Sequence, residues 1–159
     1  MLDGLLKFIS NIRNFFVEKE VAEELALDKD EIVKMVRLQL AKGIDGDGLP
    51  VYLKRHGGIF YYYAPSTKRK KDIFGVGLGS VTDPITNYMT GGFYRSIYVD
   101  VNKDATFEVK STSYLYDLIK FRSGENIINL NPESEEYLIW NKVAPDFQEE
   151  INKLYFSEV

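Results

Sequence analysis

The residues with the clearest chemical potential are six basic side chains between positions 50 and 71. That stretch contains no acid, although the chain of 159 residues has a formal net charge of −4. Its basic residues are Lys54, Arg55, Lys68, Arg69, Lys70 and Lys71. Aromatic residues, including Tyr61, Tyr62 and Tyr63, lie between the two basic groups. Basic and aromatic side chains together suit a phosphate backbone with stacked bases.

Two other interpretations of this basic segment remain open. The positive charge also suits the acidic surface of a neighbouring copy or of a partner protein. The interpretation without any binding role is a buried aromatic strand at 59–63 followed by an exposed basic loop at 66–71.

Other patterns for catalysis or ligand binding are weak. His56 is the only histidine, and no Ser or Asp stands at a spacing that indicates a catalytic triad. Asp45 and Asp47 begin like a calcium loop, but Leu49 and Pro50 occupy the positions of a ligand and a glycine. We therefore predict no catalytic residue, cofactor, metal site or small-molecule substrate, and a protein that is not an enzyme.

A glycine-rich stretch, Gly75-Val76-Gly77-Leu78-Gly79, also fails as a nucleotide site. It has neither the flanking strand and helix nor the Gly-Lys-Ser/Thr ending of a phosphate-binding loop. We expect the segment 75–92 to be long and flexible.

Composition narrows the class of protein. With 45% apolar and 14% aromatic residues, the chain is expected to fold as a globular domain. The absence of cysteine excludes disulfides, thiolate metal sites and cysteine nucleophiles. No apolar run approaches the roughly 20 residues of a membrane span, and the N-terminus lacks the pattern of a signal peptide. We expect synthesis in the cytoplasm and no membrane contact.

The N-terminal residues have the spacing of an amphipathic helix. Steps of three and four place one apolar stripe on a helix face; its members are Leu2, Leu5, Ile9, Ile12 and Phe16. The stripe either packs on the chain's own core or docks on a neighbouring subunit, and the spacing fits both. We predict an amphipathic helix or arm at 1–27, followed by a single domain at 28–159.

A second helix is expected between Asp28 and Gly43. Asp28 and Glu31 have the spacing of a capping box, and glycine suits the left-handed position that ends a helix. The expected buried stripe contains Ile32, Met35, Val36, Gln39 and Leu40, whereas Lys34, Arg37 and Lys42 are expected in solvent.

The later part of the domain combines strands with helices. Alternation from Phe93 to Val101 and again over 106–111 predicts an antiparallel hairpin at 93–111. Together with a strand near 59–63, this predicts an α+β fold in which helices pack on a small antiparallel sheet.

Two further helical regions complete the predicted order of elements. A short helix is expected at 114–121 because its apolar residues recur at helical spacing. Asn131 followed by Pro132 predicts the start of a C-terminal amphipathic region, which we expect Pro145 to divide into two pieces.

Three motifs in order resemble a known protein family. They are Gly43-Ile44-Asp45-Gly46-Asp47-Gly48, the lysine-rich loop, and Thr90-Gly91-Gly92-Phe93-Tyr94-Arg95-Ser96. This order is similar to that of small tailed-phage virion proteins, frequent in phages of Bacteroidetes, with a "kGIDsdG" turn and a "TGxFyxS" strand start. The likeness covers about residues 30–140, with 124–130 in place of the family's later Gly-Ile-Leu-like stretch.

The resemblance implies a virion structural or morphogenesis protein, similar to head-to-tail connectors and tail-completion proteins. Such proteins are usually α+β and act as rings or as copies attached to a ring. The implied partners are portal, connector or tail subunits and further copies of the chain, with packaged DNA as an additional contact. The implied location is the virion, after synthesis in the host bacterial cytoplasm. The alternative hypothesis is a small nucleic-acid-binding accessory protein that uses the segment 54–71.

Overall fold

The computed structural model describes residues 17–74, 83–88 and 90–156. Residues 17–27 are helical. The labelled elements follow in the order α2 (Lys29–Ala41), β1 (Leu53–Arg55), β2 (Gly58–Phe60), α3 (Pro65–Phe74), α4 (Gly92–Arg95), β3 (Ile97–Val101), β4 (Phe107–Ser111), α5 (Tyr116–Ser123), α6 (Pro132–Leu138), the π-helical turn η1 (Ile139–Val143) and α7 (Ala144–Phe156). The predicted α+β class is confirmed, with helices and two small antiparallel sheets.

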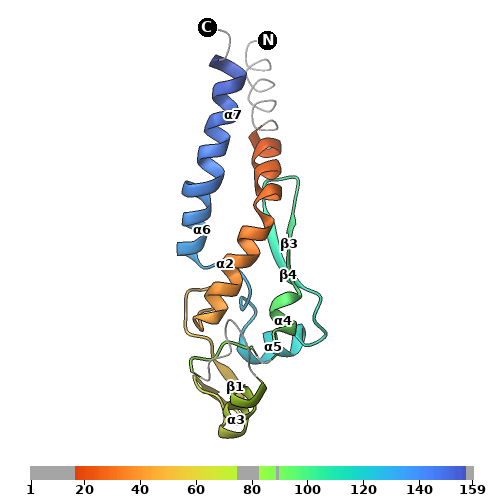
Figure 1. Ribbon diagram of the computed structural model, residues 1–159, viewed down its shortest axis with the longest axis vertical. Coiled ribbons are helices and arrows are strands. Elements are labelled where there is room, and N and C mark those ends of the chain that lie inside the picture. The colour runs from red at the N-terminus through yellow and green to blue at the C-terminus, as the bar shows by residue number, and fades with distance from the viewer. Residues whose placement is uncertain (1–16, 75–82, 89, 157–159) are drawn as a thin grey trace.

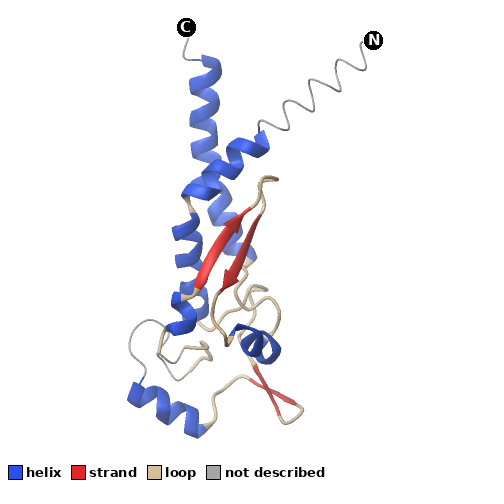
Figure 2. Cartoon of the chain, turned by 90° about the vertical axis from the view of Figure 1, so that its right-hand side faces the viewer, coloured by secondary structure: helices blue, strands red, loops and turns tan. Residues whose placement is uncertain are grey.

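The molecule is elongated, and its two ends are built from different elements. The helix of residues 17–27 and α7 form one end, while β1, β2 and α3 form the other (Figures 1 and 2). Helix α2 and the β3–β4 hairpin lie between them. None of the helices described is both long enough and apolar enough to cross a membrane.

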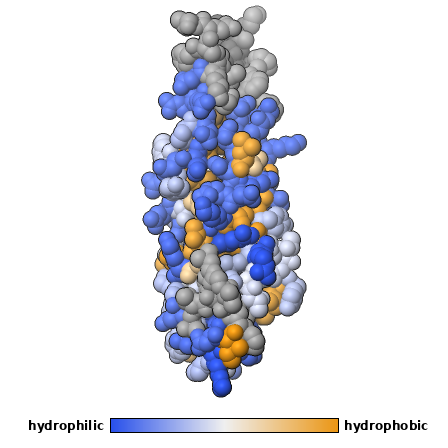
Figure 3. Space-filling model, in the orientation of Figure 1, coloured by the Kyte–Doolittle hydropathy of each residue, from blue (hydrophilic) through white to orange (hydrophobic). Residues whose placement is uncertain are grey.

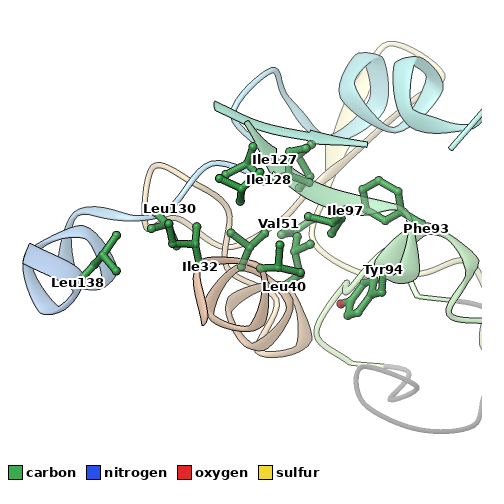
Figure 4. Close-up of a cluster of buried hydrophobic side chains, with 14 of the residues drawn as sticks. Ile32, Leu40, Val51, Phe93, Tyr94, Ile97, Ile127, Ile128, Leu130 and Leu138 are labelled. Carbon is green, nitrogen blue, oxygen red and sulfur yellow. The ribbon is translucent and has the colours of Figure 1, made fainter. Parts of the chain in front are cut away.

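Helix α2 is the central element of the core. Ile32, Val36 and Leu40 recur every four residues and are fully buried on one face, as the sequence predicts. Figure 4 shows Ile32 and Leu40 on the same side of the core cluster as Val51. The same cluster contains Ile97 of β3, Ile127, Ile128 and Leu130 of the segment before α6, and Leu138 of α6.

The expected capping box at the start of α2 is wrong. The Asp28 side chain forms no cap hydrogen bond. Residues 17–27 are already helical, so the carbonyl of Glu24 accepts the Asp28 amide and the carbonyl of Asp28 accepts the Ile32 amide. The chain therefore passes from one helix into the next and needs no side-chain cap there.

Arg37 does not lie in solvent as expected. Its Nε donates to the carbonyl of Tyr94 at 2.8 Å, and its NH2 group lies 3.5 Å from the carbonyl of Ile97. The guanidinium therefore links α2 to a backbone carbonyl of the short helix at 92–95 and to the first residue of β3.

The β3–β4 hairpin forms the sheet that packs on α2. Its register runs from Ile97 opposite Ser111 to Val101 opposite Phe107. Ile97, Val99 and Val109 are buried toward α2, which confirms the predicted inward face. This agreement covers the two strands themselves.

The strand does not begin at Phe93 as the alternation predicts. Residues 92–95 form the short helix α4, entered through Gly91 in the left-handed conformation with φ 78°. Phe93 and Tyr94 are neighbours and are both buried. A strand would point them to opposite faces, whereas a helical turn directs both toward the interior.

The strand expected near 59–63 belongs to a separate sheet. It is β2, which spans only 58–60 and pairs with β1 across a two-residue turn, His56-Gly57. Both turn residues have positive φ, at 49° and 77°, as a type I′ hairpin turn requires. The expectation of a buried aromatic strand is wrong for Tyr61 and Tyr62, which are exposed, although Tyr63 is buried.

The basic segment 66–71 is a helix and not an exposed loop. It forms most of α3, which begins at Pro65, where a fixed φ is compatible with the first helical position. The helix turns Lys71 into the interior, with 1% of its surface exposed. The predicted accessibility of this one lysine is therefore wrong.

Part of the segment 75–92, which we expect to be flexible, packs into the core. Ile85 and Thr86 are fully buried. Residues 75–82 and Met89 lie outside the described residues.

The C-terminal region is divided by a π-helical turn and not by Pro145. Asn131 caps α6 by accepting the Ser134 amide at 2.8 Å, as predicted. In η1 the Ala144 amide bonds to the carbonyl of Ile139, five residues earlier. Proline has no amide hydrogen and crowds the preceding turn, and the extra residue of the π turn lets α7 continue past Pro145. The predicted short helix near 114–121 is α5.

Candidate functional site

The first family-motif segment, 43–48, forms an internally bonded loop. The Asp45 carboxylate accepts the amides of Asp47 and Leu49 at 3.1 and 2.9 Å, and its side chain is buried. The Gly46 amide donates to the carbonyl of Asn126 at 2.8 Å. Within the described ranges, no group of three Asp, Glu or His side chains has the arrangement of a metal site.

Gln39 fastens the same region from α2. Its Nε2 donates to the carbonyl of Asn129, and its Oε1 accepts the amide of Asn131, both at 2.9 Å. Because the side chain is buried and uses both ends, it acts as a structural bridge between α2 and the segment before α6.

The second family-motif segment, 90–96, also builds the fold. The Ser96 hydroxyl contacts the carbonyl of Phe93 and the hydroxyl of Ser111, each at 2.6 Å. The Tyr94 hydroxyl donates to the carbonyl of Thr86 at 2.7 Å. Thr90 is exposed. The motif residues that carry the resemblance therefore mainly position elements, and the surfaces available for binding lie elsewhere.

One such surface is the basic tip, which we define as β1, β2, residues 61–63 and α3. It lies at the end of the molecule away from α7 (Figures 1 and 2). Five of the six predicted basic residues are exposed or half-buried there: Lys54, Arg55, Lys68, Arg69 and Lys70. Figure 3 shows apolar and strongly hydrophilic residues side by side at this end.

The hairpin of the basic tip presents cations and aromatic rings together. The Arg55 guanidinium lies 4.6 Å from the centre of the Phe60 ring, and its NH2 group donates to the carbonyl of Tyr62 at 3.1 Å. Tyr61 meets Tyr52 edge to face at 6.4 Å. Ile59 and Tyr61 remain 57% and 58% exposed. Their exposure was not predicted, although the spacing of two indicates a shared strand face.

Lys71 joins the basic tip to the body of the molecule. Its Nζ donates to the Thr86 hydroxyl at 2.9 Å and lies 4.5 Å from the centre of the Tyr63 ring. The Tyr63 hydroxyl in turn accepts the amides of Thr86 and Asn87. Burial lowers the pKa of Lys71 to about 8, because the charged ammonium loses its hydration.

The second surface is an apolar groove of about 910 Å³ in the other half of the molecule. Its walls are the helix of residues 17–27, strand β4, part of α5 with the segment 125–130, and the C-terminal helices. The apolar lining consists of Val21, Leu25, Phe107, Val109, Tyr116, Leu130, Leu138, Ile139, Val143, Ala144 and Phe147. Figure 3 shows apolar residues between the hydrophilic surfaces of this region.

Strand β4 offers an open edge to this apolar groove. The strand belongs to a two-stranded sheet, and among the described residues it pairs only with β3. Four consecutive residues of the strand, 107–110, line the groove, together with the two residues before it. Since alternate residues of a strand face opposite sides, a continuous run indicates that the edge itself borders the groove.

Acidic residues border the apolar groove. Lys110 is bonded to Asp100 at 2.8 Å and to Glu108 at 2.9 Å, which raises the pKa of Lys110. Lys120 is bonded to Glu125 at 2.7 Å. The two lysines of the groove are thus already paired with acids of their own chain.

A third apolar surface lies on α5 and the residue pair before it. Tyr114, Leu118 and Phe121 recur at helical spacing and are exposed, Phe121 to 73%. The predicted N-terminal stripe of Leu2, Leu5, Ile9, Ile12 and Phe16 lies outside the described residues.

Comparison with known proteins gives no match. No family model matches the chain, and neither a curated protein nor a solved structure is significantly similar to it.

Proposed function

We propose that the protein is a non-enzymatic structural component of a tailed-phage virion, a head-to-tail connector or tail-completion protein that assembles as a ring or on one. The sequence motifs suggest this class. The observation that carries the proposal is the separation of two unlike surfaces, the basic tip at one end and the acid-bordered apolar groove in the other half.

The basic tip and the helical end of the molecule carry opposite charge. The two helical arms, residues 17–28 and 132–149, each carry five acids and one lysine. The basic tip has the opposite sign over its accessible surface. Complementary potentials of this kind steer association and fix its orientation, and added salt weakens them.

Unlike surfaces on one chain favour head-to-tail contacts. Such a contact uses a different surface on each partner, and it generates a closed ring when the rotation between copies closes. We propose copies of this chain and portal, connector or tail subunits as its partners, and the virion as its location.

The test is the composition of purified, nuclease-treated particles, measured by quantitative mass spectrometry. The proposal predicts that the protein is present at a fixed ratio to the portal protein, near the copy number of a ring. Absence from the particles would contradict it.

One observation favours a second candidate function, binding of single-stranded nucleic acid. Lys54 contacts the Tyr52 ring, which meets exposed Tyr61, and Arg55 contacts the ring of exposed Tyr62. Together they supply cations for phosphates and rings for base stacking. The affinity for a fluorescent oligonucleotide would then fall log-linearly with salt, with a slope of about −0.7 per phosphate contacted. No binding at low salt would eliminate this candidate.

A further inference from the structure

We infer that the partner of the apolar groove is a second copy of this chain, whose β1–β2 hairpin inserts Ile59 and Tyr61 into it beside the open edge of β4. The inference rests on the proposed assembly function and names the two surfaces that meet.

The inserting surface is already ordered in the single chain. Ile59 shares one side of the hairpin with Lys54, its partner in the register, and both Lys54 and Tyr61 contact the Tyr52 ring. Tyr61, one residue beyond β2, therefore lies on the side of Ile59. Phe60 and Tyr62 lie on the other side, where both rings contact the Arg55 guanidinium. The hairpin therefore presents its apolar pair without rearrangement, which limits the entropy lost on binding.

The groove is suited to this pair in two respects: its lining is apolar, and it has a strand edge with which the hairpin can pair. The groove is lined mostly by aliphatic and aromatic side chains, and it is bordered by the unpaired edge of β4. Strand β2 has an open edge of its own, since among the described residues it pairs only with β1. Addition of a strand to an open edge supplies backbone hydrogen bonds, and the groove supplies sites for alternate side chains.

Charge complementarity selects this occupant for the groove. Lys54 lies opposite Ile59 in the strand register and so on the inserting side, and the groove lies between the two acidic helical arms. Lys110 and Lys120 do not repel the incoming hairpin strongly, because each is bonded to carboxylates of its own chain.

A chain cannot fill its own groove in this way. The hairpin lies at the end of the molecule opposite α7, whereas the groove is bordered by the helix of residues 17–27 and by the C-terminal helices (Figure 1). Each copy therefore inserts into one neighbour and receives from another, which is the heterologous contact that a ring requires.

Cysteine cross-linking tests the contact directly, because the natural chain has no cysteine. Ile59→Cys in one preparation and Ile139→Cys in another place thiols on the hairpin and on the lip of the groove, both at half-exposed positions. After mild oxidation, we expect a disulfide-linked dimer when the two variants are mixed and far less when each is oxidised alone. Ile59→Cys mixed with Phe121→Cys on α5 is the matched control. Equal yields in the two mixtures would overturn the inference.

Two further variants test the contact by the strength of self-association, without a cross-link. The double variant Ile59→Asp/Tyr61→Asp is expected to weaken self-association in sedimentation velocity by about tenfold or more. Phe121→Asp alters another exposed aromatic residue, one that does not line the groove, and should leave association unchanged. All three positions are exposed, and the circular dichroism of each variant checks that it folds.

The outcomes separate this inference from the proposed function. If the wild-type chain assembles but the cross-link and the double variant give control values, the named surfaces are wrong and the assembly function stands. If the wild-type chain stays monomeric at low salt and high concentration, the second copy is excluded as the occupant, although particle composition can still support the virion role. Protection of the amides of 105–110 from hydrogen exchange on assembly is expected, and unchanged exchange there would overturn the strand addition.

Discussion

The two β-hairpins of this protein have the same secondary structure but differ in what covers their apolar side chains. The β3–β4 hairpin has five-residue strands, packs one face on α2 and carries ion pairs on the other. The β1–β2 hairpin has three-residue strands, lies at the basic tip and leaves Ile59 and Tyr61 exposed. The first hairpin is stabilised by its own chain. The second keeps apolar surface uncovered, which is typical of an interface.

The largest expected difference between the hairpins comes from one pair of identical substitutions. Ile97→Ala removes a side chain that is 3% exposed, and it should lower the free energy of unfolding by about 3 kcal/mol. Ile59→Ala removes an exposed side chain of the same size, and it should change stability by less than about 0.5 kcal/mol. Urea denaturation of both variants at low protein concentration measures the contrast. Similar losses would mean that the tip hairpin is part of the core.

Two glycines allow the same comparison between a loop of the core region and the turn of the basic tip. A Cβ at Gly46 would overlap the carbonyl oxygen of Asn126, so Gly46→Ala should destabilise the protein by about 2 kcal/mol. Gly57 in the tip turn has open space around it, and only its φ of 77° opposes a side chain. Gly57→Ala should therefore cost about 1 kcal/mol. Thermal unfolding distinguishes the two variants, and a larger loss at Gly57 would contradict the assignment of the tip as the less constrained region.

Lys71 predicts a pH dependence for the joint between the tip and the body. Its pKa falls from an ordinary 10.5 to about 8 in the folded state, so between these values the unfolded chain binds more protons. Below pH 8 the buried Lys71 side chain is charged, and its destabilising effect is then greatest. The free energy of unfolding should therefore rise by roughly 1–2 kcal/mol between pH 8 and pH 9.5.

Lys71→Met removes this titration and provides the control. Urea denaturation across the same pH interval should show a flat profile for this variant. An unchanged slope would mean that another group titrates there. The measurement stays below pH 10, because burial raises the pKa of Tyr63 and its ionisation would oppose the effect of Lys71 at higher pH.

The smallest expected effect concerns the outward face of the β3–β4 hairpin. Glu108→Gln removes one of the two carboxylates bonded to Lys110, and Asp100 remains. All three side chains are well exposed, so the loss should stay below about 0.5 kcal/mol and shrink further with added salt. A loss above 1 kcal/mol in urea denaturation would show that this face also stabilises the hairpin substantially.

Elements with strong local signals could be predicted from the sequence. The buried stripe of α2, the inward face of β3 and β4, and the cap at Asn131 follow from periodicity and from capping chemistry, and all three are confirmed. Features that depend on distant residues could not. Phe93 and Tyr94 both face the interior, where the Tyr94 hydroxyl bonds to the carbonyl of Thr86 and the Phe93 ring stacks on Tyr116 of α5.

The candidate sites show the same limit. The cluster of six basic residues at 54–71 is apparent from the sequence. Lys71 is indistinguishable from its neighbours in sequence, and its burial depends on the Thr86 hydroxyl and the Tyr63 ring. The apolar groove is lined by residues that range from Val21 to Phe147, so no local pattern indicates it.

The π-helical turn before Pro145 determines which side chains form one wall of the groove. In a regular α-helix, a residue five positions after Leu138 would lie about 140° round the axis from it. The wider turn reduces this rotation, and Leu138, Val143 and Phe147 all line the groove. The one inserted residue thus changes which side chains after it face the groove. A homologue that lacked both this residue and the proline could keep the same wall with an uninterrupted α-helix, and the two changes should therefore be found together.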